Sequence, residues 1–159
     1  MIETIAIYVD IHYIYGHKPI ILTTMAYKII DVEGIGPAYA EKLIAAGIST
    51  AEELLEKCAA PKGRKELAEA TGIPEKLVLK WTNHADMYRI RGIGPQFAEL
   101  LEASGVDTVK ELSHRVAANL AAKVAEVNAE KKLVGRVPVE SEIQKMIDEA
   151  KTLPGVITY

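Results

Sequence analysis

Two stretches of this chain repeat one pattern at a spacing of 58 residues, and this internal repeat constrains the fold more than any other feature. Residues 34–54 and 92–112 agree at 12 of 21 positions, and both begin with Gly-Ile-Gly-Pro. A repeat of this size indicates that one piece of supersecondary structure occurs twice. We expect a single compact domain built from both copies, because each copy alone is too small to bury a sufficient core.

Each copy contains the same helix start and stop signals. Pro37 and Pro95 suit the first position of a helix, where a missing N–H costs nothing. Gly47 and Gly105 suit a left-handed helix end. The next helices are expected to begin with capping boxes, Thr50–Glu53 and Thr108–Glu111. One buried face is predicted from the helical spacing of Ala40, Leu43, Ile44 and Gly47.

The remaining helices are predicted at 26–32, 65–70, 74–88 and 140–152, with a loop at 61–64 and a stop at Pro154-Gly155. The fold class is therefore all-α, with two units related by an approximate two-fold axis. The first unit covers about 28–85 and the second about 86–143, followed by a C-terminal helix at 140–153.

Residues 1–24 follow a different pattern. Ile5, Ile7, Val9 and Ile11 alternate with more polar residues, which is the period of a β-strand. Our preferred interpretation is an upstream extension, with Met25 as the functional start. The alternative is a short β-hairpin that packs on the helical body or exchanges with another copy. A signal peptide is not expected, because the start is not basic and no cleavage site follows.

Composition excludes several classes of function. Cys58 is the only cysteine, so an intrachain disulfide and a thiolate zinc site are both excluded. A reducing, cytoplasmic location is the simplest expectation. The sequence contains no Walker loop, no dinucleotide fingerprint and no paired acid and base, so we predict no catalysis, no cofactor and no metal. No segment is long and apolar enough to span a bilayer.

The apolar segment, Gly-Ile-Gly turn and Pro-led helix together resemble the helix-hairpin-helix motif. The first glycine permits positive φ, the isoleucine fills the space between two helices, and the helix start offers free N–H groups to an anion. Residues 30–55 and 88–112 resemble such units in the N-terminal domains of archaeal and eukaryotic recombinases. In nucleic-acid-binding relatives this anion is a phosphate of the nucleic-acid backbone, and the resemblance implies the same contact here.

Residues 25–159 as a whole are similar to a bacterial and archaeal family catalogued only as a domain of unknown function. Its members carry two hairpins joined by a Thr-Gly-Ile…Trp connector, here Thr71-Gly72-Ile73 and Trp81. The resemblance implies a compact helical fold and no established activity.

Charge limits the nucleic-acid interpretation. The net charge is −3, and residues 28–57 carry three basic and six acidic residues. The segment 92–114 carries one basic and four acidic residues, whereas 58–91 carries seven basic and four acidic ones. We predict a non-catalytic module that binds DNA or RNA backbone weakly and with salt sensitivity. The candidate contact residues are Gly34, Ile35, Gly36, Lys62, Arg64, Lys65, Arg89, Arg91, Gly92, Ile93 and Gly94.

The alternative is a protein-interaction adaptor on the same scaffold, with no membrane partner and an oligomeric state that the sequence leaves open. Other candidate residues have structural explanations. Trp81, Tyr39 and Phe97 are expected to fill the core. Cys58 has no nearby histidine to activate it, and His84 lacks a partner at metal-ligand spacing.

Overall fold

The computed structural model describes residues 27–159. Every secondary-structure element assigned within this range is a helix, as predicted. A 3-10 helix precedes eight α-helices: η1 (Ile29–Asp31), α1 (Pro37–Ala45), α2 (Ala51–Cys58), α3 (Pro61–Thr71), α4 (Glu75–Met87), α5 (Pro95–Ala103), α6 (Val109–Ser113), α7 (Ala117–Lys131) and α8 (Glu140–Thr152). The expectations for residues 1–24 concern a segment outside the described residues.

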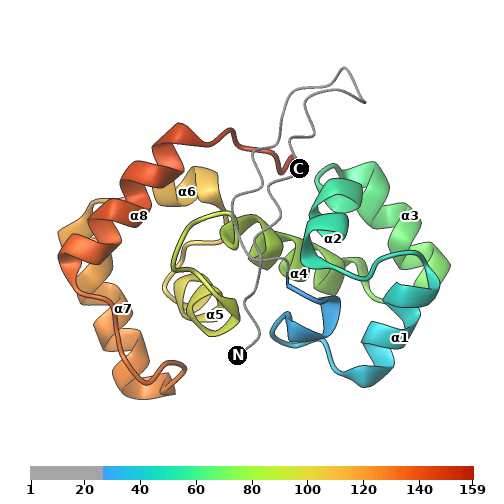
Figure 1. Cartoon of the computed structure of the whole chain (residues 1–159), viewed down its shortest axis with the longest axis horizontal. Coiled ribbons are helices and arrows are strands. Elements are labelled where there is room, and N and C mark those ends of the chain that lie inside the picture. Colours follow the sequence, from blue (N-terminus) through green and yellow to red (C-terminus); the bar gives the residue numbers. More distant parts are fainter. Residues whose placement is uncertain (1–26) are drawn as a thin grey trace, which may run out of the picture.

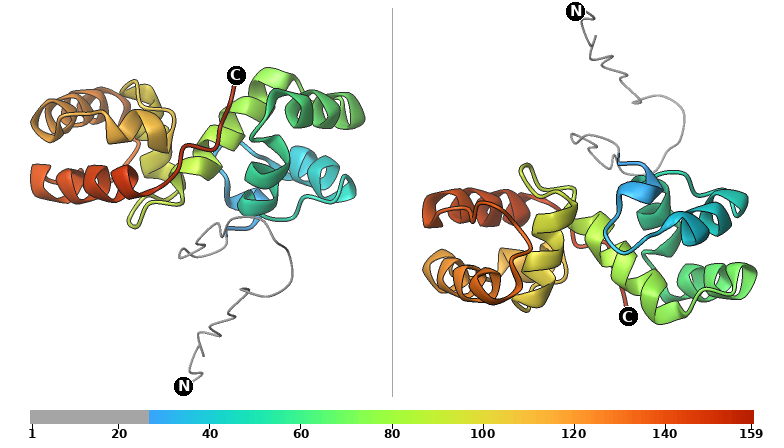
Figure 2. Two further views of the ribbon diagram at one scale, coloured as in Figure 1. Left: turned by 90° about the horizontal axis from the view of Figure 1, so that it is seen from above. Right: turned by 90° about the horizontal axis from the view of Figure 1, so that it is seen from below.

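The helices repeat in order and in packing. α2 and α3 both pack against α4, and α6 and α7 both pack against α8. In Figures 1 and 2, α1–α3 and α5–α8 form two neighbouring groups with α4 between them. α1–α4 therefore correspond to α5–α8, whereas the approximate two-fold axis between the units stays a prediction.

α4 belongs to both units. It packs against α2 and α3 as the fourth helix of the first unit, and its end leads directly into the second Gly-Ile-Gly turn. The hydrogen bonds before the two turns correspond. The Val32 N–H donates to the Ile29 carbonyl at 3.3 Å, and the Ile90 N–H donates to the Met87 carbonyl at 3.1 Å.

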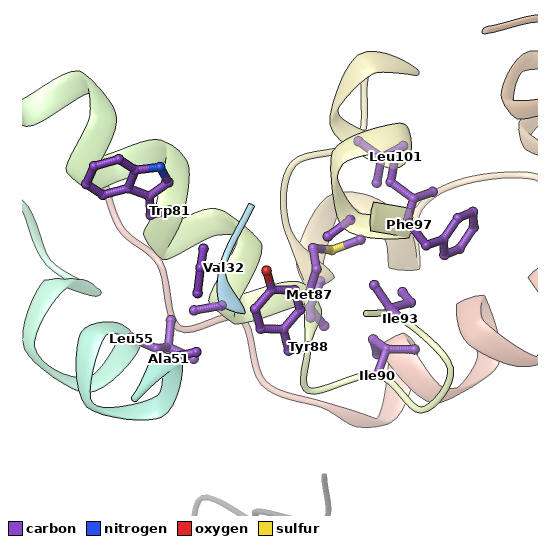
Figure 3. Packing of buried hydrophobic residues seen from close by; sticks show 14 of the residues in the cluster. Val32, Ala51, Leu55, Trp81, Met87, Tyr88, Ile90, Ile93, Phe97 and Leu101 are labelled. Carbon is purple, nitrogen blue, oxygen red and sulfur yellow. The ribbon is translucent and has the colours of Figure 1, made fainter. Parts of the chain in front are cut away.

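The buried apolar side chains form one cluster that includes residues of both units. Figure 3 shows Met87 and Tyr88 of the α4 region between Val32 on one side and Phe97 and Leu101 of α5 on the other, with Trp81 on the far side of Val32. A shared core of this kind makes the two units one folding domain. Trp81 is fully buried, so its predicted core role is confirmed.

The predicted glycine helix ends are confirmed, and so is the first of the two predicted capping boxes. Gly47 and Gly105 have φ of 88° and 89°, as left-handed helix ends require. Thr50 accepts a hydrogen bond from the Glu53 N–H, and the Glu53 carboxylate accepts one from the Thr50 N–H. The second box is only half formed, because the Glu111 carboxylate accepts from the Asp107 N–H instead.

Two predicted boundaries were wrong. The helix predicted at 26–32 is reduced to the three residues of η1, because Lys28 is extended and pairs with Thr50 in an antiparallel bridge. The loop predicted at 61–64 is the first turn of α3, which begins at Pro61. A Cβ at Gly63 would lie 1.8 Å from the Lys57 carbonyl oxygen, so glycine is needed where α2 and α3 approach each other.

The chain after α8 returns to the first unit. The Thr158 N–H donates to the Ala59 carbonyl at 2.9 Å. In Figure 1 this C-terminal tail runs from α8 towards α2. The tail therefore connects the last helix to the junction of α2 and α3.

Candidate nucleic-acid interface

The two Gly-Ile-Gly turns have nearly the same backbone. We call residues 34–37 turn 1 and residues 92–95 turn 2. Gly34 and Gly92 have φ of 88° and 89°, a conformation that favours glycine strongly. Ile35 and Ile93 are buried, as expected for side chains that fill the space beneath each turn.

Each turn ends in a helix start with unpaired backbone donors. Pro37 and Pro95 are the first residues of α1 and α5, and no side chain caps either helix. The first N–H that bonds back to the start of α1 is that of Ala40, to the Gly36 carbonyl at 2.9 Å. The N–H groups of Ala38 and Tyr39 therefore precede the hydrogen-bonded part of the helix and can bind an acceptor.

The two turns differ in how much of them is covered. At Gly36 an added Cβ would meet nothing within 4 Å, and Gly36 is exposed. At Gly94 an added Cβ would lie 3.3 Å from the Tyr27 hydroxyl oxygen. The Arg91 N–H donates to the Glu149 carboxylate, with both oxygens at 3.3 Å. Turn 1 is open, whereas turn 2 already has a phenol and a carboxylate against it.

The fourth helix of each unit, α4 or α8, places one side chain against the first glycine of that unit's turn. An added Cβ at Gly34 would lie 3.3 Å from Trp81 Nε1, and one at Gly92 would lie 3.2 Å from Met146 Cε. Trp81 of α4 thus corresponds to Met146 of α8. This register agrees with burial, because Val78, Thr82 and Ala85 are buried and so are Ile143, Ile147 and Ala150.

Arg89, predicted to flank a phosphate, is engaged inside the protein. Its guanidinium donates to Asp86 Oδ1 at 2.6 Å and to the Pro154 carbonyl at 2.9 Å, and its side chain is only 13% exposed. Asp86 also accepts the Val109 N–H at 2.8 Å. Burial raises the pKa of Asp86, and its bonds to Val109 and Arg89 oppose that rise. In this geometry Arg89 balances a buried carboxylate.

Arg64 is likewise internal. It is 3% exposed, and its guanidinium donates to the carbonyls of Cys58 and Ala59 at 2.9 Å and of Thr158 at 2.7 Å. The predicted basic cluster on α3 therefore presents Lys62 and Lys65 but not Arg64. The helical spacing of Arg64, Leu67 and Thr71 was the sequence signal for this inward position.

Arg91 is exposed, as are Lys62 and Lys65. Lys62 lies 3.9 Å from Glu66 in a surface ion pair of the i, i+4 kind, which contributes little. Of the basic residues predicted to contact nucleic acid, these three lie at the surface of the folded protein. The acidic residues Asp31, Glu33 and Glu41 near turn 1 are also exposed.

Sequence reasoning missed a polar cluster between α4 and α5. Buried His84 contacts the Glu102 carboxylate through Nε2, and Lys80 Nζ lies 3.7 Å from the other oxygen of Glu102. Burial acts to raise the pKa of Glu102, but the hydrogen bond and charge of His84 and the charge of Lys80 outweigh it and lower that pKa. Only the tertiary fold brings His84 and Glu102 together.

Cys58 is buried, and burial raises the pKa of its thiol to about 11. The thiol is therefore protonated at neutral pH and is a poor nucleophile. Within residues 27–159 no group of three or more His, Cys, Asp and Glu side chains is arranged to hold a metal ion. None of the helices in that range has the length and apolarity to cross a membrane.

The family model described as "Domain of unknown function (DUF4332)" matches residues 33–153. No curated protein and no solved structure matches.

Proposed function

Since the chain belongs to the DUF4332 family, described as a domain of unknown function, its function has to be argued from the site. We propose that it is a non-catalytic module that binds the phosphate backbone of nucleic acid without reading sequence. In this proposal, turn 1 and turn 2 bind phosphate groups as the turns of a helix-hairpin-helix protein do. Contacts of this kind position a protein on nucleic acid and carry no base specificity.

The openness of turn 1 carries the proposal. The N–H groups of Ala38 and Tyr39 stand at the positive end of α1, and no atom outside the turn lies within 4 Å of the Cβ position at Gly36. A phosphate oxygen can therefore approach the backbone there, where the helix dipole favours negative charge. Turn 2 contributes the charge of Arg91 beside it.

The surface charge sets the expected strength. Arg64 and Arg89 are committed internally, and turn 1 is near exposed acidic residues. Contact with about 2–4 phosphates gives weak binding that falls as salt increases. We therefore expect binding at low ionic strength that is largely lost at physiological salt.

The test is a fluorescence-anisotropy titration of the full chain with single-stranded, duplex and branched DNA and with RNA, at two salt concentrations. Gly36→Asp separates binding from folding. The new carboxylate caps α1 and occupies the donors of turn 1, so affinity should fall at least about tenfold while stability is kept. Gly36→Ala is the matched control, because its methyl group enters open space and leaves the donors free.

A second pair of variants tests turn 2. Arg91→Ala should weaken binding to every nucleic acid to a similar extent and reduce the salt dependence, because one phosphate contact is lost. Arg136→Ala is the control, since Arg136 is an exposed arginine outside both turns in sequence, and its guanidinium already pairs with Glu142. Equal affinities for wild type, Gly36→Asp and Arg91→Ala would remove both turns from the interface.

A protein-interaction adaptor is the second candidate. It is favoured by the internal use of Arg64 and Arg89 and by the acidic balance of residues 28–57 and 92–114. Salt dependence distinguishes the two functions, because an apolar protein interface does not weaken steeply with salt. Absence of any binding to DNA or RNA at low salt would favour this candidate.

A further inference from the structure

Residues 153–159, which follow α8 and are called here the tail, cross from the second unit to the first (Figures 1 and 2). Near the start of the tail, the Arg89 guanidinium donates to the Pro154 carbonyl at 2.9 Å. An added Cβ at Gly155 would lie 3.4 Å from the Lys110 side chain, so the tail passes close to α6. The tail therefore contacts both units before it reaches the junction of α2 and α3.

That junction binds both backbone groups of Thr158. The Thr158 N–H donates to the Ala59 carbonyl at 2.9 Å, and the Arg64 guanidinium donates to the Thr158 carbonyl at 2.7 Å. Arg64 is 3% exposed and is fixed by further bonds to the carbonyls of Cys58 and Ala59. Thr158 itself is exposed. The junction thus recognises backbone and leaves the side chain at this position free to vary.

The two residues before Thr158 supply apolar contacts. Val156 and Ile157 are half-buried and pack against the hydrophobic core. Main-chain hydrogen bonds combined with side-chain contacts are a common way for a protein to hold an extended peptide. The surface under the tail therefore suits an extended segment with two neighbouring apolar residues, followed by a residue that has a free N–H.

The tail is held more loosely than the helices. None of residues 153–159 is buried, and Pro154, Gly155, Thr158 and Tyr159 are exposed. Segments with few buried contacts open locally at a small cost in free energy. Opening would leave the donor and the acceptor at the junction, and the apolar surface beside them, without their partners.

We propose that the surface under the tail is a docking site for an extended, apolar segment of a partner protein. The tail is the resident occupant of this site, and the partner displaces it. Occupation by the tail lowers the apparent affinity for the partner, because only the open fraction of the protein can bind. The proposal does not rest on the nucleic-acid function, since neither turn 1 nor turn 2 takes part.

Phosphate fits this surface less well than a peptide does. The Ala59 carbonyl is an acceptor, so its partner has to carry a donor, which the phosphate diester of a nucleic acid lacks. Burial, followed by the charges of Glu111 and Asp107, raises the pKa of Tyr159, so acidic side chains lie near the end of the tail. A peptide backbone offers both a donor and an acceptor and carries no negative charge.

A second copy of this chain is also a weaker alternative. If two copies exchanged tails, each tail would make the contacts that it already makes within one chain. Association would still cost translational and rotational freedom. A segment of a different protein can add contacts beyond those of the tail, which an identical tail in the same place cannot.

The test uses full-length chains and a synthetic peptide. The triple variant Val156→Ser, Ile157→Ser and Thr158→Pro, called the released variant, removes the apolar contacts and the bonded N–H of the tail. The probe is a fluorescein-labelled, amidated peptide with the sequence of residues 153–159, and its binding is measured by fluorescence anisotropy. The released variant should bind the peptide at least about tenfold more tightly than the wild type, whose own tail competes.

Two altered peptides test how the segment is recognised. Thr158→Pro in the peptide removes the N–H that Ala59 accepts, so affinity should fall at least about tenfold. Thr158→Ala should bind like the original peptide, because the junction uses only the backbone of that residue. Equal binding of these two peptides would overturn the proposal. So would equal binding of the original peptide to wild type and released variant, or no binding up to about 1 mM.

Folding and other partners are measured in parallel. The released variant should keep a cooperative thermal transition, since its changed residues are at most half-buried. If it does not, Thr158→Pro alone takes its place. Tighter binding of DNA by the released variant would overturn the proposal in favour of phosphate. A wild-type dimer in sedimentation that becomes monomeric in the released variant would overturn it in favour of exchanged tails.

Discussion

The two units fix the start of their second helix by different means. In the first unit the Ala51 N–H donates to the backbone carbonyl of Tyr27 at 2.9 Å. In the second the equivalent N–H, that of Val109, donates to the side chain of Asp86 at 2.8 Å. Tyr27 precedes the extended Lys28, whereas Asp86 lies in the last turn of α4, where its own carbonyl accepts the Arg89 N–H.

This difference explains the internal role of Arg89. In the second unit the acceptor is a carboxylate instead of a backbone carbonyl, and Asp86 is only 1% exposed. A buried carboxylate requires a compensating charge. Arg89 provides it at 2.6 Å. An arginine beside a hairpin turn therefore serves the fold in this protein, although its position in the sequence suggests a ligand.

The largest effect should distinguish the residues beneath the two turn glycines. Trp81→Ala should reduce the free energy of unfolding by about 3–5 kcal/mol, because a fully buried aromatic leaves a large cavity. Met146→Ala should cost about 1–2 kcal/mol, because Met146 is half-buried. Urea unfolding of both variants would measure this asymmetry, and equal losses would show that the units are supported in the same way.

Asp86→Ala should come next, with a loss of about 3 kcal/mol, because it leaves Arg89 and the Val109 N–H without their acceptor. Asp148→Ala, which removes an exposed aspartate of α8, should stay within about 0.5 kcal/mol. Adding Arg89→Met to Asp86→Ala should restore part of the loss by removing the unpaired charge. If the double variant is less stable than Asp86→Ala, the pair does not explain Arg89.

Alanine at the turn glycines should have intermediate effects. Gly34→Ala should cost about 1–3 kcal/mol, because φ is positive and the rigid Trp81 ring is adjacent. Gly92→Ala should cost about 1–2 kcal/mol, because the end of Met146 can move aside. Gly36→Ala has neither constraint and should be near neutral. Thermal unfolding of the three variants would contradict this order if Gly36→Ala were as damaging as Gly34→Ala.

The smallest effect should depend on pH. Burial, followed by the charges of Glu111 and Glu102, raises the pKa of Asp107 above its ordinary 3.8. The ionised form is therefore less favourable in the folded protein than in the unfolded chain, and this cost is present above the raised pKa. Asp107→Ser introduces the residue that the first unit has at the equivalent position 49.

Asp107→Ser should therefore raise the Tm at pH 7, and the gain should disappear as the pH falls below 3.8, where the carboxyl is protonated in both states. Thermal unfolding from pH 7 to pH 3 measures this difference. A gain that persists at pH 3 would assign the effect to packing rather than to ionisation.

The sequence by itself determined the repeat, the all-α class and those helix ends that are set by caps and turns. Gly47, Gly105, Thr50 and Pro37 act on groups within a few residues, so their effects can be read locally. The last helix was predicted at 140–152 and is found at those residues. Membership of the family followed from the pattern of turns and connector.

Only the tertiary structure decided which basic side chains are available to a ligand and which are bonded inside the protein. Arg64 bonds to a carbonyl 94 residues away and Arg89 to one 65 residues away, and no local pattern specifies such partners. It also decided that turn 1 is open, that turn 2 is covered by Tyr27 and Glu149, and that Ile44 is exposed. The physical reason is that caps and turns are set by neighbours in sequence, whereas burial and ion pairing depend on which helices meet.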